Sequence, residues 1–201
     1  MSHTTEPTLW DERSALIAIL DELLHRPRDP LTTGSSCTGP GLYAVFYRCR
    51  RTGPRRLDST PGTAALEQVD AATWPVYVGS ALSVRERFNR HLTNAAHLID
   101  IEPGELWTLE LPLRSHAASL YAEALVIDAL QPVWNQYWCR GFGSRDQGPT
   151  RTGQAPSPFS RLHRISPRGP RSEAIRDELA ESVRRHLMAT VFPHRGWTPM
   201  R

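Results

Sequence analysis

The chain has 201 residues, enough for one domain with extensions and too few for two domains of ordinary size. With 39% hydrophobic and 22% charged residues and a net charge of +3, the composition excludes wholesale disorder. The sequence has neither an apolar run of membrane length nor a basic stretch followed by an apolar one near its start. We therefore expect a cytoplasmic protein without a signal peptide or a membrane span.

Two short segments concentrate the positive charge. All 24 basic residues are arginines; residues 48–56 hold five of them and no acid, and residues 140–171 hold seven and one acid. Because the rest of the chain is net acidic, these clusters indicate a binding site for a polyanion, of which nucleic acid is the natural candidate. Solvated loops that carry charge without a partner are the alternative.

The first half of the chain predicts one helix and two short strands. Residues 8–25 repeat leucine and isoleucine at helical spacing. Residues 41–47 (GLYAVFY) and 76–79 (VYVG) are short apolar and aromatic runs with glycine, which favours strands. The segment between them, 48–74, is too long for a tight hairpin and is predicted to be a functional or disordered loop.

The second half predicts two further helices around one strand, and then a third helix. Ser83 and Glu86 have the spacing of a capping box and begin a helix. Residues 105–113 alternate apolar and polar side chains like a strand, and 115–130 forms an apolar helix. After an arginine-rich segment, predicted to be an ordered loop, residues 172–191 have apolar positions four residues apart, typical of a packing or dimer helix.

Glu123 is a single carboxylate in an apolar run, LYAEALVI. Burying an unpaired carboxylate is costly, so Glu123 is expected either to meet a cation in a structural salt bridge or to bind a metal ion. A carboxylate oxygen suits Mg²⁺ or Mn²⁺. The run of residues leaves both alternatives open.

Arg87 and His91 are four residues apart on the helix that begins at Ser83, so both side chains lie on one face. Arginine can bind a phosphate through two N–H groups, and histidine can accept or donate a proton near neutral pH. A chance pair of surface residues is the alternative at this stage.

Two glycine-tyrosine triplets, 41–43 (GLY) and 77–79 (YVG), give the chain a family resemblance. With Arg87, Glu123 and Asn135 following in order, the sequence resembles the GIY-YIG nuclease superfamily. The long insertion, the Arg87 and His91 pair and the segment 131–151 (QPVWNQYWCRGFGSRDQGPTR) are similar to the type II restriction endonucleases that cut CCGCGG. Many superfamily members have lysine after the second triplet, where this chain has Ser80.

This resemblance implies an α+β fold in which a small three-stranded antiparallel sheet is flanked by helices. A catalytic core at 37–139, with an arginine-rich insertion at 48–74, would follow a helical extension at 1–36. An arginine-rich DNA-contacting segment and a helix would complete the chain at 140–201. The implied activity is metal-dependent hydrolysis of phosphodiester bonds in double-stranded DNA, at a GC-rich palindrome such as CCGCGG.

The resemblance also implies roles for individual residues. Tyr43 would take a proton from the attacking water, Tyr77 would position the water or the phosphate, and His91 would polarise or relay from Tyr43. Arg87 would offset charge on the phosphorane, and Glu123 would hold one Mg²⁺ or Mn²⁺ ion. For Asn135 a hydrogen bond that fixes the site and a simple turn role remain open.

Arginines would recognise the DNA, because a guanidinium fits the O6 and N7 atoms of guanine. A symmetric target requires two chains, so we expect a homodimer, and a cognate DNA methyltransferase in the same system. A repair or mobile-element nuclease of the same superfamily and a DNA-binding protein without cleavage are the alternatives. The DNA-binding candidates are Arg48, Arg50, Arg51, Arg140, Arg145, Arg151, Arg161, Arg164 and Arg168.

Overall fold

The computed structural model describes residues 12–48, 74–96, 98, 101–142, 157–163 and 173–190. Within these ranges, four strands form one antiparallel sheet in the order β1-β4-β2-β3. The strands are β1 (Asp29–Pro30), β2 (Gly41–Tyr47), β3 (Pro75–Ala81) and β4 (Leu106–Pro112).

The expectation of three strands is wrong by one. β1 has only two residues, which pair with Thr108 and Trp107 of β4. A strand this short has no alternating pattern for sequence analysis to detect, and it ends in a proline. The three longer strands lie where the apolar runs predict them.

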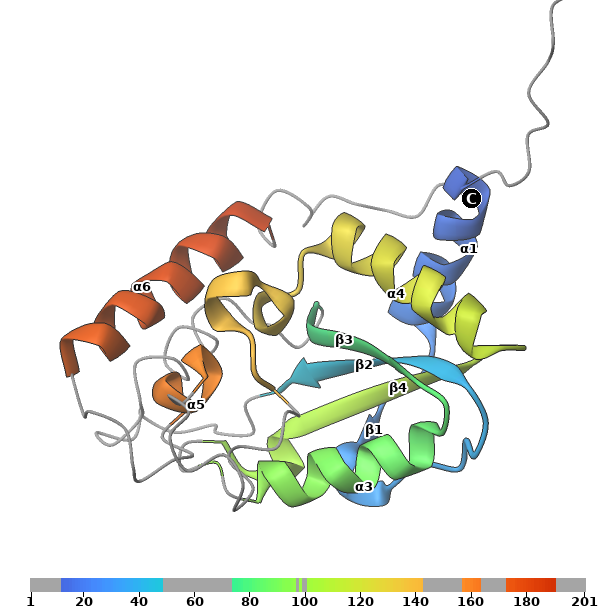
Figure 1. The fold of residues 1–201 in the computed structure, drawn as a ribbon, viewed down its shortest axis with the longest axis horizontal. Helices are drawn as coiled ribbons and strands as arrows, with labels where there is room; N and C mark the ends of the chain where they lie inside the picture. Colours follow the sequence, from blue (N-terminus) through green and yellow to red (C-terminus); the bar gives the residue numbers. More distant parts are fainter. Residues whose placement is uncertain are drawn as a thin grey trace, which may run out of the picture.

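Helices cover both faces of the sheet (Figure 1). α1 (Glu12–His25) and α4 (His116–Leu130) lie on one face, and α3 (Val84–Ala95) lies on the other. The strand residues divide accordingly, because successive side chains of a strand point to opposite faces. Leu42 and Phe46 of β2 belong to the apolar core beneath α1 and α4, whereas Tyr43 belongs to the core beneath α3.

The second core extends from α3 to the C-terminal part of the described chain. α6 (Glu173–Thr190) packs on α5 (Pro158–Leu162) and on the segment that follows α4. The presence of α5 corrects the prediction of a loop here: Ser157 Oγ accepts from the Ser160 amide, and a proline begins the helix. A five-residue helix within an arginine-rich segment has too few apolar positions to show a period.

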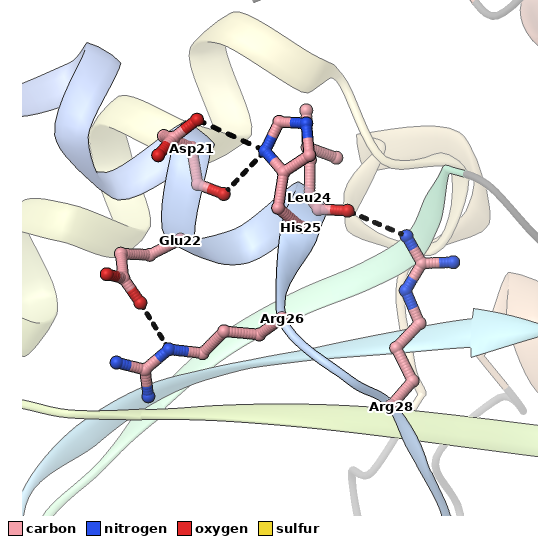
Figure 2. Close-up of polar contacts among 6 residues, drawn as sticks. All are labelled: Asp21, Glu22, Leu24, His25, Arg26 and Arg28. Atoms are coloured by element: carbon pink, nitrogen blue, oxygen red, sulfur yellow. Dashed lines mark hydrogen bonds and ion pairs between the residues drawn. The ribbon is translucent and has the colours of Figure 1, made fainter.

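At the end of α1, the His25 and Arg28 side chains contact helix carbonyl groups (Figure 2). His25 Nδ1 lies 2.9 Å from the Asp21 carbonyl oxygen, and Arg28 Nη2 donates to the Leu24 carbonyl oxygen at 3.4 Å. The Arg28 guanidinium also lies 3.8 Å from the centroid of the Phe46 ring, and burial lowers the Arg28 pKa. These contacts satisfy the exposed end of the helix and attach it to β2.

The first turn of α3 is held at two points. Of the predicted capping box, the structure has the bond from the Glu86 amide to Ser83 Oγ, at 3.4 Å. The next contacts come from the connection before β2: the Val84 and Arg85 amides donate to the carbonyl oxygens of Gly39 and Cys37, at 3.2 and 2.8 Å. These bonds fix where α3 begins relative to the sheet.

Several predictions concern segments outside the described residues. The insertion 48–74 is described only at Arg48 and Trp74, and most of 140–171 is likewise outside. The proposed division into 1–36, 37–139 and 140–201 therefore stays a prediction. No helix in the described part of the chain is long and apolar enough to cross a bilayer.

Candidate active site

The Tyr43 hydroxyl lies at the centre of a polar cluster beneath α3. His91 Nε2 lies 2.8 Å from the Tyr43 oxygen, and Arg87 Nε donates to the same oxygen at 3.2 Å. The i, i+4 spacing of Arg87 and His91 brings both side chains to one face of α3, as the sequence predicts. Tyr43 and His91 are both 0% exposed, so these bonds form away from bulk water.

Tyr77 borders this cluster from the neighbouring strand. Its ring centroid lies 6.1 Å from that of Tyr43 and 5.7 Å from that of His91. Tyr77 and Arg87 are both partly exposed, unlike Tyr43 and His91. The open side of the cluster is therefore the side of Tyr77 and Arg87.

Burial determines the protonation states at rest. Burial raises the pKa of Tyr43 well above its usual value near 10, and the neighbouring Tyr77 adds to this, while Arg87 opposes it. Burial lowers the pKa of His91 to about 3, and the positive charges of Arg87 and Arg90 act in the same direction. Near pH 7 the site thus holds a protonated Tyr43, a neutral His91 and a charged Arg87.

Two glycines permit these close contacts. Gly79 stands opposite Tyr43 in the β2–β3 register, and a Cβ atom there would lie 2.5 Å from the Tyr43 hydroxyl and 2.9 Å from Tyr77. At Gly41 a Cβ atom would lie 2.9 Å from Val84, at the start of α3. Glycine at both positions therefore lets α3 and the two phenol rings approach the sheet.

Glu123 reaches the same part of β3 from the other face of the sheet. Its Oε2 atom accepts a bond from Ser80 Oγ at 2.5 Å. Ser80 follows Gly79, so the carboxylate and the Tyr43 hydroxyl contact adjacent residues of β3 from opposite faces. Because β3 is an edge strand, a ligand that reaches both groups has to approach along its outer edge.

Asn135 covers part of that outer edge. Its side-chain Nδ2 donates to the Val78 carbonyl oxygen and its Oδ1 accepts from the Val78 amide, both at 2.8 Å. The side chain thus pairs with β3 as a neighbouring strand would. Because Val78 is next to Gly79 and Ser80, Asn135 holds in place the edge of β3 at which the candidate site lies.

The carboxylate of Glu123 fits a hard divalent cation. Mg²⁺ typically keeps several waters and takes one or two protein carboxylates together with substrate phosphate oxygens. After accepting one bond from Ser80, the Glu123 carboxylate has further lone pairs for an ion, and no described residue forms an ion pair with it. No group of three or more His, Cys, Asp and Glu side chains suited to a metal occurs within the described ranges.

Glu110 is a carboxylate that sequence analysis does not single out. It stands opposite Tyr43 in the β2–β4 register, and its Oε2 accepts from Ser35 Oγ at 2.7 Å and from the Cys37 amide at 3.2 Å. Cys37 in turn accepts the Arg85 amide bond at the start of α3. Glu110 therefore helps to hold the helix that carries Arg87 and His91.

The same connection borders an open cavity of about 600 Å³, whose lining includes Cys37, Thr108 and Glu110. Neither the tyrosines nor Glu123 line this cavity. The catalytic candidates therefore lie outside this cavity, beside the outer edge of β3 that Asn135 partly covers.

Phe142 completes the cluster and is also missed by sequence analysis. Its ring stacks on the His91 ring at 4.7 Å with an interplanar angle of 5°, and lies 5.0 Å from the Tyr77 ring. One aromatic residue in a segment rich in arginine, glycine and serine has no periodicity that would indicate burial. Its contacts depend on the path of the chain after α4.

The arginine candidates are described only in part. Arg48 is exposed and lies over the Trp107 ring at 5.0 Å, and Arg161 is partly buried in α5. Arg140 is exposed and lies over the Tyr137 ring at 4.8 Å. The candidates outside the described residues are Arg50, Arg51, Arg145, Arg151, Arg164 and Arg168.

In comparisons with known proteins, no family model matches this chain and no curated protein is similar to it. The resemblance to the GIY-YIG superfamily therefore rests on the sequence motifs alone and stays a prediction.

Burial of neutral His91 predicts acid sensitivity of the fold. An unfolded histidine titrates near 6.5, so between pH 6.5 and about 3 the unfolded chain binds more protons than the folded one. We expect the free energy of unfolding to fall by up to about 1.4 kcal/mol for each pH unit below 6.5. Urea unfolding between pH 7 and pH 4.5 measures this slope.

His91→Gln should reduce the slope, because glutamine cannot take up the proton that the unfolded histidine binds. An unchanged acid slope in His91→Gln would show that other groups cause it.

Proposed function

We propose that this chain is a metal-dependent endonuclease of the GIY-YIG kind that hydrolyses phosphodiester bonds in double-stranded DNA. The observation that carries the proposal is the bonding of Tyr43 to both Arg87 and His91, beneath the strand edge that Glu123 reaches through Ser80. Two phenols, a guanidinium, an imidazole and a carboxylate around one edge are groups that suit phosphoryl transfer.

Proton transfer is assigned to Tyr43. Because the pKa of Tyr43 is raised at rest, its hydroxyl can take a proton from water only as its own proton leaves. The hydrogen bond to His91 Nε2 polarises the hydroxyl, and the Arg87 N–H group stabilises negative charge on the phenol oxygen; together these contacts favour the loss of that proton. The attacking water would come from the partly exposed side, where Tyr77 can position it.

Neutralisation of the negative charge on the phosphate is assigned to Arg87 and to a divalent ion bound by Glu123. The guanidinium is partly exposed beside the phenols, so it can also contact a phosphate oxygen. A divalent ion bound by Glu123 would act as a Lewis acid on the scissile phosphate and the leaving oxygen. Ser80 and Asn135 hold the carboxylate and the strand edge in place.

Specific recognition of DNA belongs to the same proposal. The likeness of 131–151 to restriction endonucleases that cut CCGCGG supports a GC-rich palindrome as the target. The arginine-rich segments supply the cations that bind the DNA phosphates. A palindromic target matches a homodimer, and a cognate methyltransferase would protect the same target in the host genome. The complete burial of Tyr43 favours one second candidate, a DNA-binding protein that does not cleave.

Incubation with supercoiled plasmid tests the proposal. We expect discrete linear fragments with Mg²⁺ or Mn²⁺ from a plasmid that contains CCGCGG, and none when EDTA is present. Sequencing the fragment ends identifies the target. A retarded but uncut plasmid would establish the binding protein instead, and cleavage only of branched or damaged DNA would establish a repair nuclease.

A further inference from the structure

The segment 133–142 is fixed onto the candidate active site at both of its ends. Near its start, the Asn135 side chain pairs with Val78 on the outer edge of β3. At its end, Phe142 stacks on His91 and contacts Tyr77. The segment is therefore a rim of the site, with a position set by the catalytic candidates themselves.

Between these two anchors, the rim turns one aromatic side chain outward. Tyr137 is 77% exposed, whereas Trp134, Cys139 and Phe142 of the same segment are buried. The Arg140 guanidinium lies over the Tyr137 ring, 4.8 Å from its centroid. The inward side chains give the rim its apolar anchor, so the outward pair is not needed for packing.

We propose that Tyr137 and Arg140 form a DNA-binding surface beside the strand edge that carries Gly79 and Ser80. The inference rests on the proposed function and extends it to the nucleotides that flank the reacting phosphate. Arg140 contacts a backbone phosphate, and the Tyr137 ring packs on the neighbouring sugar or base.

The geometry of the pair suits this ligand. Stacking uses the face of a guanidinium and leaves the N–H groups at its edge free to donate to phosphate oxygens. Arg140 forms no ion pair with a described residue, so its charge is available to an anion. A tyrosine ring orders few torsions on binding and packs on a base or sugar at small entropic cost.

Fluorescence anisotropy of a labelled duplex that contains CCGCGG tests the proposal, in EDTA so that binding is measured without cleavage. We expect Tyr137→Ala to weaken binding about 10-fold and Tyr137→Phe to keep it, because the ring supplies the contact. We expect Arg140→Ala to weaken binding and to lower the slope of log Kd against log salt concentration by about 1.

Two control variants remove similar groups elsewhere. Met188→Ala removes an exposed apolar side chain on α6, and Arg13→Ala removes an exposed cation on α1. Both should bind the duplex as the parent chain does. Equal binding by Tyr137→Ala and the parent chain would overturn the proposed surface.

Sedimentation of the same variants tells whether the partner of this surface is DNA or a second copy of the chain. If Tyr137→Ala lowers the oligomeric mass and leaves DNA affinity unchanged, the pair is an interface between copies of the chain and the proposal is wrong. A parent chain that binds no duplex would overturn the proposed function and this inference together. Binding that is lost in Tyr137→Ala, in a parent chain that never cleaves, would keep this inference and remove the nuclease.

Discussion

Replacing Tyr43 with phenylalanine is expected to lower the rate of DNA cleavage by at least roughly 100-fold while DNA binding is kept. The substitution keeps the ring that packs against Phe88 and Tyr77, but it removes the oxygen that Arg87 and His91 contact. Single-turnover cleavage of plasmid, together with duplex binding in EDTA, measures the two effects separately. The N–H group that loses its acceptor costs about 1–3 kcal/mol of stability, which urea unfolding measures.

Tyr47 provides a matched control for this substitution. It is a buried tyrosine on the same strand and the same face of the sheet, four residues after Tyr43. Tyr47→Phe should cleave at a rate close to that of the parent chain. If Tyr43→Phe keeps full activity, the phenol has no part in the reaction and the assignment of the site is wrong.

Local signals account for most of the fold that sequence analysis predicts. β2 is a continuous apolar run because it is the central strand beneath helices on both faces, and the whole strand is buried. α4 is apolar around most of its surface, and it begins at Ser115 and ends before Pro132 as its sequence indicates. Such elements carry their own start and stop signals.

The parts that were missed depend on contacts between distant residues. β1 becomes a strand only because β4 offers it a pairing edge, and Phe142 is buried only because the chain returns to His91 after α4. The spacing of Arg87 and His91 predicts that both side chains lie on one face of their helix. It does not predict whether that face packs on the sheet or how far each side chain is buried. The complete burial of His91, and hence its lowered pKa, follows from tertiary packing alone.

The groups on the two faces of β3 differ in how far the sequence predicts their position: the tyrosine side has a local motif, and the Glu123 side has none. The triplet 77–79 indicates a strand, and in the structure the Tyr43 hydroxyl lies 2.5 Å from where a Cβ atom of residue 79 would be. For Glu123, the apolar run leaves a salt bridge and a metal ion as open alternatives. The contact that places the carboxylate, the bond from Ser80, joins residues 43 positions apart and has no local signature.

Replacing Glu123 with glutamine separates the charge of this side chain from its shape. The amide oxygen can still accept the Ser80 bond, so the contact with β3 and the fold are expected to remain. A neutral amide binds a divalent cation much more weakly than a carboxylate does, and we expect cleavage to fall by about 1000-fold or more. Duplex affinity in EDTA should be unchanged or higher, because one negative charge near the phosphates has gone.

Asp128→Asn on the same helix is the matched control, since it removes an exposed carboxylate without touching β3. Dependence on the metal gives a further discrimination. If Glu123 holds the ion, Glu123→Gln should need a higher Mg²⁺ concentration for half-maximal residual cleavage, whereas Asp128→Asn should follow the parent curve. Full activity of Glu123→Gln at the parent Mg²⁺ requirement would mean that this carboxylate only anchors Ser80, and the metal site would have to be sought elsewhere.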